Sequence, residues 1–136
     1  MPKPLQVYVV EDSQIVRRLL SDAIERAGAE LTGSSGDAQT AIGDVFALQP
    51  DLILIDIGLA SGSGFDVLRI LQEQCLVPRA TKVVLTNYAD VEYENLCVRL
   101  GADQFFDKSF EISQALALIN SLAAKARRHG AGAVRV

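Results

Sequence analysis

The stretch Asp51–Leu59 has the sequence DLILIDIGL, in which four consecutive apolar residues lie between two aspartates. A short uninterrupted run of Ile and Leu is typical of a strand buried on both faces, as in a parallel sheet. Pro50 marks a boundary before this strand, and the Gly- and Ser-rich segment 58–64 predicts a loop after it. Asp56 therefore lies at the carboxyl end of a central strand, where open α/β sheets bind their ligands. Taken alone, this carboxylate could equally be a simple cap.

Length and composition narrow the class of protein. The chain has 136 residues, 49% hydrophobic and 6% aromatic, which predicts one domain with an aliphatic α/β core. A net charge of −4 gives no sign of direct nucleic-acid binding. Without an apolar run of membrane-spanning length or a signal peptide, no membrane association and a cytoplasmic location are expected. Cys75 and Cys97 have no metal-ligand spacing and are expected to be reduced core thiols.

Strand-like and helix-like segments alternate along the chain. The strands are expected over residues 5–10, 30–33, 52–56, 81–85 and 104–107. The helices are expected over residues 14–27, 38–48, 65–75, 91–100 and 111–128. This alternation predicts an α/β fold with a doubly wound, five-stranded parallel sheet and helices on both faces.

The helix ends and helix faces also follow from the sequence. Ser13 and Asp37 are the expected N-caps of the first two helices, and Gly28 and Gly101 are expected helix stops. Apolar residues recur at three- and four-residue spacing, so they are expected to face the core. In the first two helices these residues are Ile15, Val16, Leu19, Leu20, Ala23, Ile24, Ala27, Ala38, Ala41, Ile42, Val45, Phe46 and Leu48.

Polar residues follow four of the predicted strands at the point where each strand ends. Glu11 and Asp12 follow the first strand, Asp56 the third, Thr86 the fourth and Lys108 the fifth. The carboxyl ends of parallel strands meet at one edge of a sheet. We therefore expect three carboxylates, a hydroxyl and an ammonium to share one small cleft.

The chemistry of this set favours phosphoryl transfer. Carboxylates that lie close together repel one another unless a cation lies among them, and all-oxygen ligands with room for water suit Mg²⁺. Phosphoryl transfer needs mainly positioning and charge neutralisation, and Asp56 is the best-placed nucleophile. Each residue alone has an ordinary explanation as a cap, a turn residue or a solvated lysine. Their convergence at one edge favours a functional site.

The chain resembles the receiver domain of bacterial two-component response regulators from Leu5 to about Leu122. The segments that carry the resemblance are Val9–Ser13, Leu54–Ile57, Gly64, Val84–Thr86, Gly101–Asp103 and Lys108. The spacing of Asp12, Asp56, Thr86 and Lys108 is that of the family. The resemblance also implies the flavodoxin-like strand order 2-1-3-4-5.

This resemblance implies a phosphorylation site that depends on a metal ion. Asp56 is expected to be the phosphoacceptor and to take a phosphoryl group from a phosphohistidine on a sensor histidine kinase or a histidine phosphotransfer protein. Glu11, Asp12, Asp56 and the backbone carbonyl of Gly58 are expected to hold Mg²⁺ or Mn²⁺. No further enzymatic activity is implied beyond the domain's own phosphotransfer and slow autodephosphorylation.

The resemblance also implies how a signal leaves the domain. Thr86 and Lys108 are expected to contact the phosphoryl group, and Phe105 occupies the family's aromatic switch position. Phosphorylation would then change the packing around Thr86 and Phe105 and switch a surface that binds an unidentified downstream protein. Phe105 is equally compatible with an ordinary core aromatic on a strand.

The chain departs from the family's pattern at four positions. Ser109 follows the lysine where the family commonly has proline, and Ala60 lies four residues after the phosphoacceptor, where proline is also frequent. Asn87 follows the threonine where a small residue is usual, so it can narrow the site or add a hydrogen bond. Phe105 stands where tyrosine is usual and brings no hydroxyl.

The receiver domain is expected over residues 1–124. Residues 125–136 are expected to hold the end of the last helix and a short flexible tail, with no effector domain. The sequence leaves open whether the chain acts alone or belongs to a longer regulator.

Two other functions are alternatives to a phosphorylated receiver. The first is a hydrolase that uses an aspartyl phosphate. Such a hydrolase usually has a second acid two residues after the nucleophile, and Gly58 at that position argues against it. A pseudo-receiver that binds partners without phosphorylation is the other alternative, and the complete acidic set with Lys108 argues against it.

Overall fold

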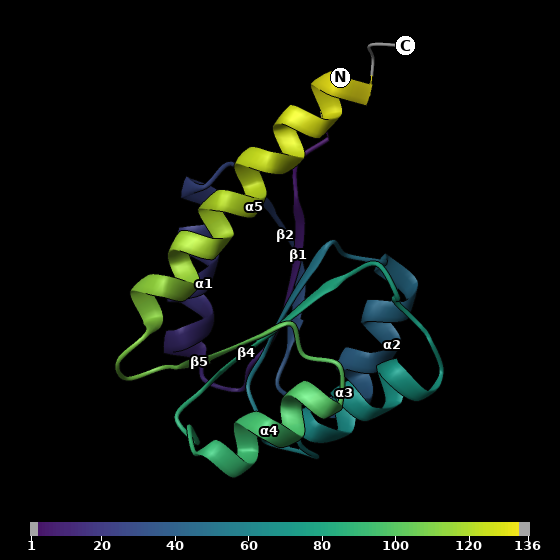
Figure 1. Ribbon diagram of the computed structural model, residues 1–136, viewed down its shortest axis with the longest axis vertical. Helices are drawn as coiled ribbons and strands as arrows, with labels where there is room; N and C mark the ends of the chain where they lie inside the picture. Colours follow the sequence, from purple (N-terminus) through teal and green to yellow (C-terminus); the bar gives the residue numbers. More distant parts are fainter. Residues whose placement is uncertain (1–2, 134–136) are drawn as a thin grey trace.

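Five parallel strands form the central sheet, in the order β2-β1-β3-β4-β5 (Figure 1). The computed structural model describes residues 3–133, with the side chains of residues 3–128. The strands are β1 (Gln6–Val10), β2 (Glu30–Ser35), β3 (Leu52–Ile55), β4 (Thr81–Thr86) and β5 (Gln104–Asp107). The fold class and the strand order are therefore as predicted.

The strand β3 is the middle of the sheet. It pairs with β1 on one side and β4 on the other, so Leu54 lies opposite both Val9 and Val83. All four residues of β3 are buried. Burial on both faces explains why this strand is apolar throughout instead of alternating between polar and apolar residues. Asp56 follows directly at its carboxyl end, as the sequence predicts.

Helices cover both faces of the sheet (Figure 1). They are α1 (Gln14–Arg26), α2 (Ala38–Leu48), α3 (Gly64–Glu73), α4 (Val91–Arg99) and α5 (Ile112–Ala133). Helices α1 and α5 pack on one face, and α2, α3 and α4 pack on the other. This doubly wound arrangement leaves the loops after the strands to form the site.

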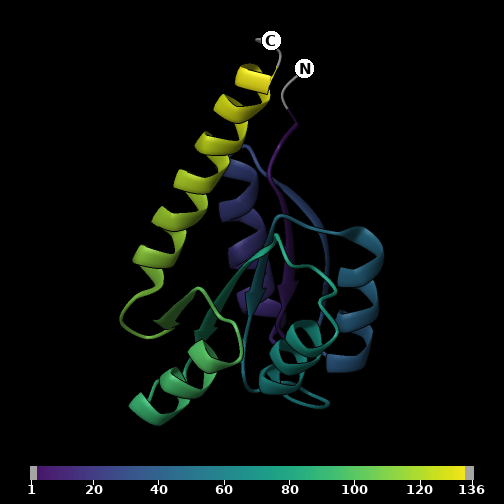
Figure 2. The ribbon, with the colours of Figure 1, turned by 45° about the vertical axis from the view of Figure 1, so that its right-hand side comes forward.

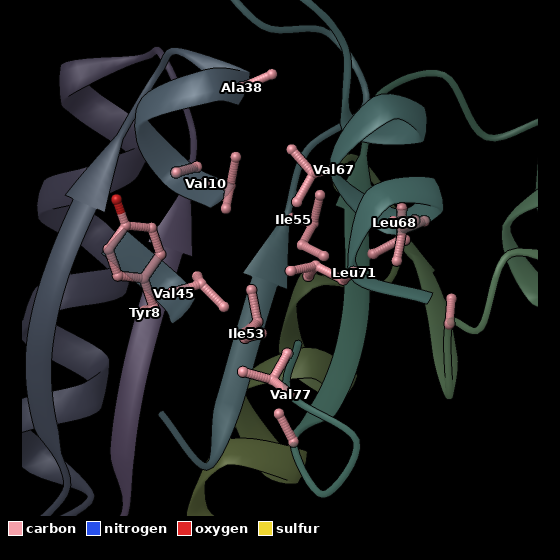
Figure 3. Close-up of a cluster of buried hydrophobic side chains, with 14 of the residues drawn as sticks. Tyr8, Val10, Ala38, Val45, Ile53, Ile55, Val67, Leu68, Leu71 and Val77 are labelled. Carbon is pink, nitrogen blue, oxygen red and sulfur yellow. The ribbon is translucent and has the colours of Figure 1, made fainter. Parts of the chain in front are cut away.

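Strand side chains alternate between two hydrophobic layers. Figure 3 shows Tyr8, Ile53 and Ile55 pointing toward the layer that includes Val45 of α2 and Leu71 of α3. The strand residues that alternate with them, such as Val9 and Leu54, belong to the other layer, with residues of α1 and α5. This alternation follows from the two-residue period of a strand. It therefore sets the face of the sheet toward which the last side chain of each strand points.

The predicted helix caps are confirmed. The Ser13 hydroxyl accepts a hydrogen bond from the Val16 backbone N–H (3.3 Å), and an Asp37 carboxylate oxygen accepts one from the Thr40 N–H (2.8 Å). Gly28 has a φ of +78°, in the left-handed region that suits a helix stop. Ser13 thus caps α1 two residues after Glu11, so the loop that holds Glu11 and Asp12 between β1 and α1 is short.

Four apolar helix residues predicted to face the core are exposed instead. Ile15 is 83% exposed and Leu19 is 46% exposed, whereas Leu20 and Ile24 of the same helix are buried. One residue is about 100° of helix rotation, so Ile15 and Leu19 lie one step around from the packed stripe. Phe46 and Leu48 of α2 are likewise exposed. The predicted apolar face was therefore too wide.

The prediction that both cysteines are core thiols is right for Cys97 and wrong for Cys75. Cys97 is buried in α4, and burial raises the pKa of its thiol to about 11, with a smaller contribution from the charge of Glu94. Cys75 is exposed. It lies beyond Glu73, where α3 ends, so it does not belong to the apolar face of that helix.

The last helix is longer than predicted. It continues to Ala133, beyond the expected end at Arg128, so the start of the predicted tail is helical; residues 134–136 lie outside the described residues. Figure 2 shows α5 extending beyond the sheet. A guanidinium nitrogen of Arg127 donates to the Ala27 carbonyl at 2.8 Å, which ties the last part of the predicted helix to the end of α1. Within the described part of the chain, no helix has the length and apolarity needed to cross a membrane.

Candidate functional site

The carboxyl ends of neighbouring strands bring the predicted site residues together. Glu11 and Asp12 follow β1, Asp56 follows β3, and Thr86 is the last residue of β4. Lys108 follows β5, and its backbone N–H donates to the Thr86 carbonyl at 2.9 Å. The sheet therefore places all five residues at one edge.

Lys108 bridges two carboxylates. Its ammonium nitrogen lies 2.6 Å from a Glu11 carboxylate oxygen and 2.8 Å from an Asp56 carboxylate oxygen, with all three side chains less than a tenth exposed. Burial lowers the pKa of Lys108, but the hydrogen bonds and charges of Asp56 and Glu11 outweigh it, so the pKa lies above its ordinary value. The site thus holds a fixed positive charge directly against Asp56.

Three carboxylates form the acidic part of the site. Glu11, Asp12 and Asp56 each place an oxygen within 4.8 Å of the other two, and Asp12 is the exposed member. Burial raises the pKa of Glu11, with opposing contributions from Lys108 and from the Ser13 N–H. With Lys108 included, three negative charges and one positive charge leave a net charge of −2. This oxygen donor set, open to solvent at Asp12, fits a hydrated divalent cation.

Both oxygens of Asp56 have donors. One accepts from Lys108, and the other accepts from the backbone N–H of Gly58 at 3.3 Å. The structure thus shows the N–H of Gly58 at the site, while its carbonyl as a metal ligand stays a prediction. Glu11 is held similarly, because its second oxygen accepts from the Ser13 N–H at 3.0 Å.

Tyr88 is a site residue that the sequence analysis missed. Its ring lies so close to Gly58 that a Cβ at position 58 would come within 2.6 Å of a ring carbon. Its backbone N–H donates to the Thr86 hydroxyl oxygen at 3.2 Å, and its side chain is largely exposed. The sequence signal that could have indicated this role is an aromatic residue two positions after Thr86. Tyr88 thus links the loop after β3 to the loop after β4.

The loop that carries Lys108 is held by hydrogen bonds and contains no proline. The Ser109 N–H donates to an Asp107 carboxylate oxygen at 2.8 Å, and the Asp107 N–H donates to a Glu111 carboxylate oxygen at 2.9 Å. The Ser109 hydroxyl donates to the Asn87 side-chain oxygen at 3.2 Å. No cis peptide bond occurs in the part of the chain that the structure describes. A trans backbone with these bonds therefore brings Lys108 to Asp56.

The Gly- and Ser-rich loop after β3 is tied to the loop before α2. The Ala38 N–H donates to the Ser61 carbonyl at 3.0 Å, and the Ala60 N–H donates to the Gly36 carbonyl at 3.2 Å. Gly36 in turn lies against Asp12, where an added Cβ would come within 2.7 Å of the Asp12 Cα. The backbone around the acidic residues is therefore held from several sides.

The predicted switch pair lies beside the site. Thr86 is fully buried, and Phe105 is a half-buried residue of β5 that packs against the hydrophobic layer under α2, α3 and α4. Phe105 pairs with Val84 across the two strands. This position is compatible with both a switch and an ordinary core residue, so the switch role stays a prediction.

Among the described residues, a narrow hollow lined by Glu11 and Asp56 at this edge has no room for a water molecule. A hollow of about 580 Å³ lies at the opposite edge, where Leu5, Asp51 and Thr81 mark the beginnings of three strands. It contains none of the predicted site residues.

Comparison with known families and proteins gives consistent matches. Residues 7–120 match the family model described as the response regulator receiver domain. The chain is 31% identical over 125 residues to the KDP operon transcriptional regulatory protein KdpE of Escherichia coli, covering 92% of this chain and 52% of that protein. It is 25% identical over 117 residues to the chemotaxis protein CheY of Thermotoga maritima, covering 86% and 96%. The chain thus spans about half of KdpE and nearly all of that CheY.

Solved structures share the fold. The chemotaxis protein CheY4 of Vibrio cholerae superposes with a TM-score of 0.77 at 21% identity, covering 88% of this chain and 98% of that one. A Burkholderia pseudomallei response regulator with a phosphorylated aspartic acid, a calcium ion and citrate has a TM-score of 0.75 at 24% identity, covering 92% and 72%. At these identities the similarity concerns the arrangement of the sheet and helices.

Proposed function

The chain belongs to the response regulator receiver domain family, and on that basis we propose that Asp56 is its phosphoacceptor. Receiver domains are signalling phosphoacceptors of two-component systems. The observation that carries the proposal is the bridge from the Lys108 ammonium to Asp56 and Glu11, within the acidic cluster. This arrangement puts a nucleophile and a neutralising cation in contact.

Asp56 is better suited than the neighbouring acids to act as the nucleophile. Glu11 is more deeply buried than Asp56, and Asp12 is exposed and lies outside the lysine bridge. Asp56 directly follows the central strand and has Lys108 on one oxygen and the Gly58 N–H on the other. A phosphoryl group on one of its oxygens would thus remain within reach of a positive charge.

The proposed reaction is transfer from a phosphohistidine. A carboxylate oxygen of Asp56 forms a bond to phosphorus, and the bond from phosphorus to the donor's imidazole nitrogen breaks. The electron pair of the broken bond stays on the imidazole, which takes up a proton, and Asp56 becomes an acyl phosphate. Lys108 neutralises charge on the transferred group. Slow hydrolysis of the acyl phosphate would reset the domain.

The acidic cluster would hold a divalent cation during this reaction. Glu11, Asp12 and Asp56 supply carboxylate oxygens, and the Gly58 carbonyl is the further proposed ligand. The site's net charge of −2 matches the charge of Mg²⁺ or Mn²⁺. When bound, such an ion supplies charge neutralisation for phosphoryl oxygens. Lys108 would supply a further positive charge to the same group.

Thr86 would couple phosphorylation of Asp56 to a change at the surface that binds the downstream protein. Its oxygen accepts from the Tyr88 N–H, which leaves the hydroxyl hydrogen free to donate to a phosphoryl oxygen. Movement of this buried side chain would change the space beside Phe105 and thereby the surface formed by α4, β5 and α5. The donor partner would be a sensor histidine kinase or a histidine phosphotransfer protein, and the receiving partner a protein that reads this surface.

Labelling with a small phosphodonor tests the proposal. Wild-type protein with acetyl phosphate and Mg²⁺ should gain the mass of one phosphoryl group, and the gain should require the metal. Asp56→Asn should abolish it, because an amide is not a comparable nucleophile. Asp22→Asn, an exposed position on α1, is the matched control and should be labelled normally. No labelling of the wild type would favour a receiver that is not phosphorylated.

A further inference from the structure

Two departures from the family's pattern meet in the folded chain. Asn87 directly follows Thr86, and Ser109 directly follows Lys108. The Ser109 hydroxyl donates a hydrogen bond to the Asn87 side-chain oxygen at 3.2 Å. The contact therefore joins the residues that follow the two proposed phosphoryl contacts.

This side-chain bond continues the pairing of β4 and β5 beyond the end of the sheet. The last paired residues are Thr86 and Asp107, and the Lys108 N–H then donates to the Thr86 carbonyl at 2.9 Å. Beyond this bond, the residue after β4, Asn87, and the second residue after β5, Ser109, are joined through their side chains. The Lys108 backbone is thus bonded to β4 directly, and the residue after Lys108 is bonded to the residue after β4.

The position of the lysine backbone matters because its side chain is long and flexible. The Lys108 ammonium contacts Glu11 and Asp56. The direction of the Lys108 backbone decides whether the ammonium can reach these two carboxylates. In a loop where the family commonly has proline, Ser109 supplies a hydrogen bond instead.

We infer that Asn87 and Ser109 are positioning residues that form a clasp between the two loops and hold Lys108 on Asp56. The inference rests on the proposed function, because it assigns the clasp a role in phosphorylation at Asp56. Neither residue needs to touch the phosphoryl group for this role. The clasp lies at the exposed rim of the site, so its loss should alter the site more than the fold.

A double-mutant cycle tests the clasp. Ser109→Ala, Asn87→Ala and the double variant should each be phosphorylated by acetyl phosphate about threefold to fivefold more slowly than the wild type, as expected for one exposed hydrogen bond. The three variants should be equally slow, because either single change removes the whole interaction. Ser109→Thr keeps the hydroxyl and should restore the rate, and Ser121→Ala on α5 should leave it unchanged.

A second measurement keeps this test separate from the test of the proposed function. In unphosphorylated protein, the NMR signals of the Lys108 backbone and side chain should shift equally in both alanine variants and the double variant, and should return to the wild-type position in Ser109→Thr. This readout is independent of whether Asp56 accepts phosphate. Unchanged Lys108 signals, additive effects of the two alanine changes, or faster phosphorylation of Asn87→Ala would overturn the clasp.

Discussion

Replacing Lys108 by methionine would remove the cation that bridges the carboxylates of Asp56 and Glu11. The net charge of the site would change from −2 to −3, with two of the acids nearly buried. Removing one partner of a buried ion pair typically costs 3–5 kcal/mol. Because the site is at the rim of the sheet and Asp12 is open to solvent, we expect the lower end, about 3 kcal/mol at neutral pH without metal.

The same substitution should slow phosphorylation by about a hundredfold, the usual effect of losing one group that neutralises transition-state charge. Urea unfolding with and without Mg²⁺ would measure the first effect, and acetyl phosphate labelling the second. Mg²⁺ should restore part of the lost stability, since the proposed cation site exists only in the folded acidic cluster. Lys125→Met, an exposed position on α5, should change stability by less than about 0.5 kcal/mol. A Lys108→Met protein with wild-type stability and labelling rate would refute this account of the bridge.

Three further outcomes are expected. Tyr8→Phe removes the hydrogen bond to Asp44 (2.7 Å) and should cost about 1 kcal/mol in urea unfolding at pH 7. Burial, and then Asp44, raise the pKa of the Tyr8 phenol above its ordinary 10.0, so stability is fully present below pH 10 and falls as the pH rises further; Tyr8→Phe should lack this fall. Cys75 should react with an aromatic disulfide in native protein, whereas Cys97 should react only on unfolding. Phe105→Ala should keep phosphorylation but lose the beryllofluoride-induced amide shifts over residues 90–105, and Phe105→Tyr should keep both; full shifts in the alanine variant would exclude the switch.

Sequence patterns predicted the fold well because the strongest signals are local. The apolar run before Asp56 could only be a buried strand in this context, and Ser13 and Asp37 have side chains that cap helices wherever a helix follows. The site followed from the same pattern, because parallel strands bring their carboxyl ends together whatever their order. Thus Asp56 and Lys108 could be placed at one edge before any contact was known.

The remaining features depend on contacts between distant segments. Ile15 has the spacing of a core residue, and only the position of α1 on the sheet shows that it lies outside the packed stripe. The contact between Tyr88 and Gly58 and the bond between Asn87 and Ser109 each join two loops, so neither sequence segment carries the signal alone. The continuation of α5 to Ala133 was missed for another reason, because the sequence beyond Arg128 has weak helix preference.

Locating the phosphoryl group on the chain tests the central claim most directly. Wild-type protein would be phosphorylated with acetyl phosphate and Mg²⁺, and the acyl phosphate would be reduced with borohydride, which converts a phosphorylated aspartate to homoserine. Peptide fragmentation would then identify the converted residue. The account predicts conversion at Asp56 alone, and none when Mg²⁺ is withheld. Conversion at Asp12, or at any other residue in place of Asp56, would contradict it.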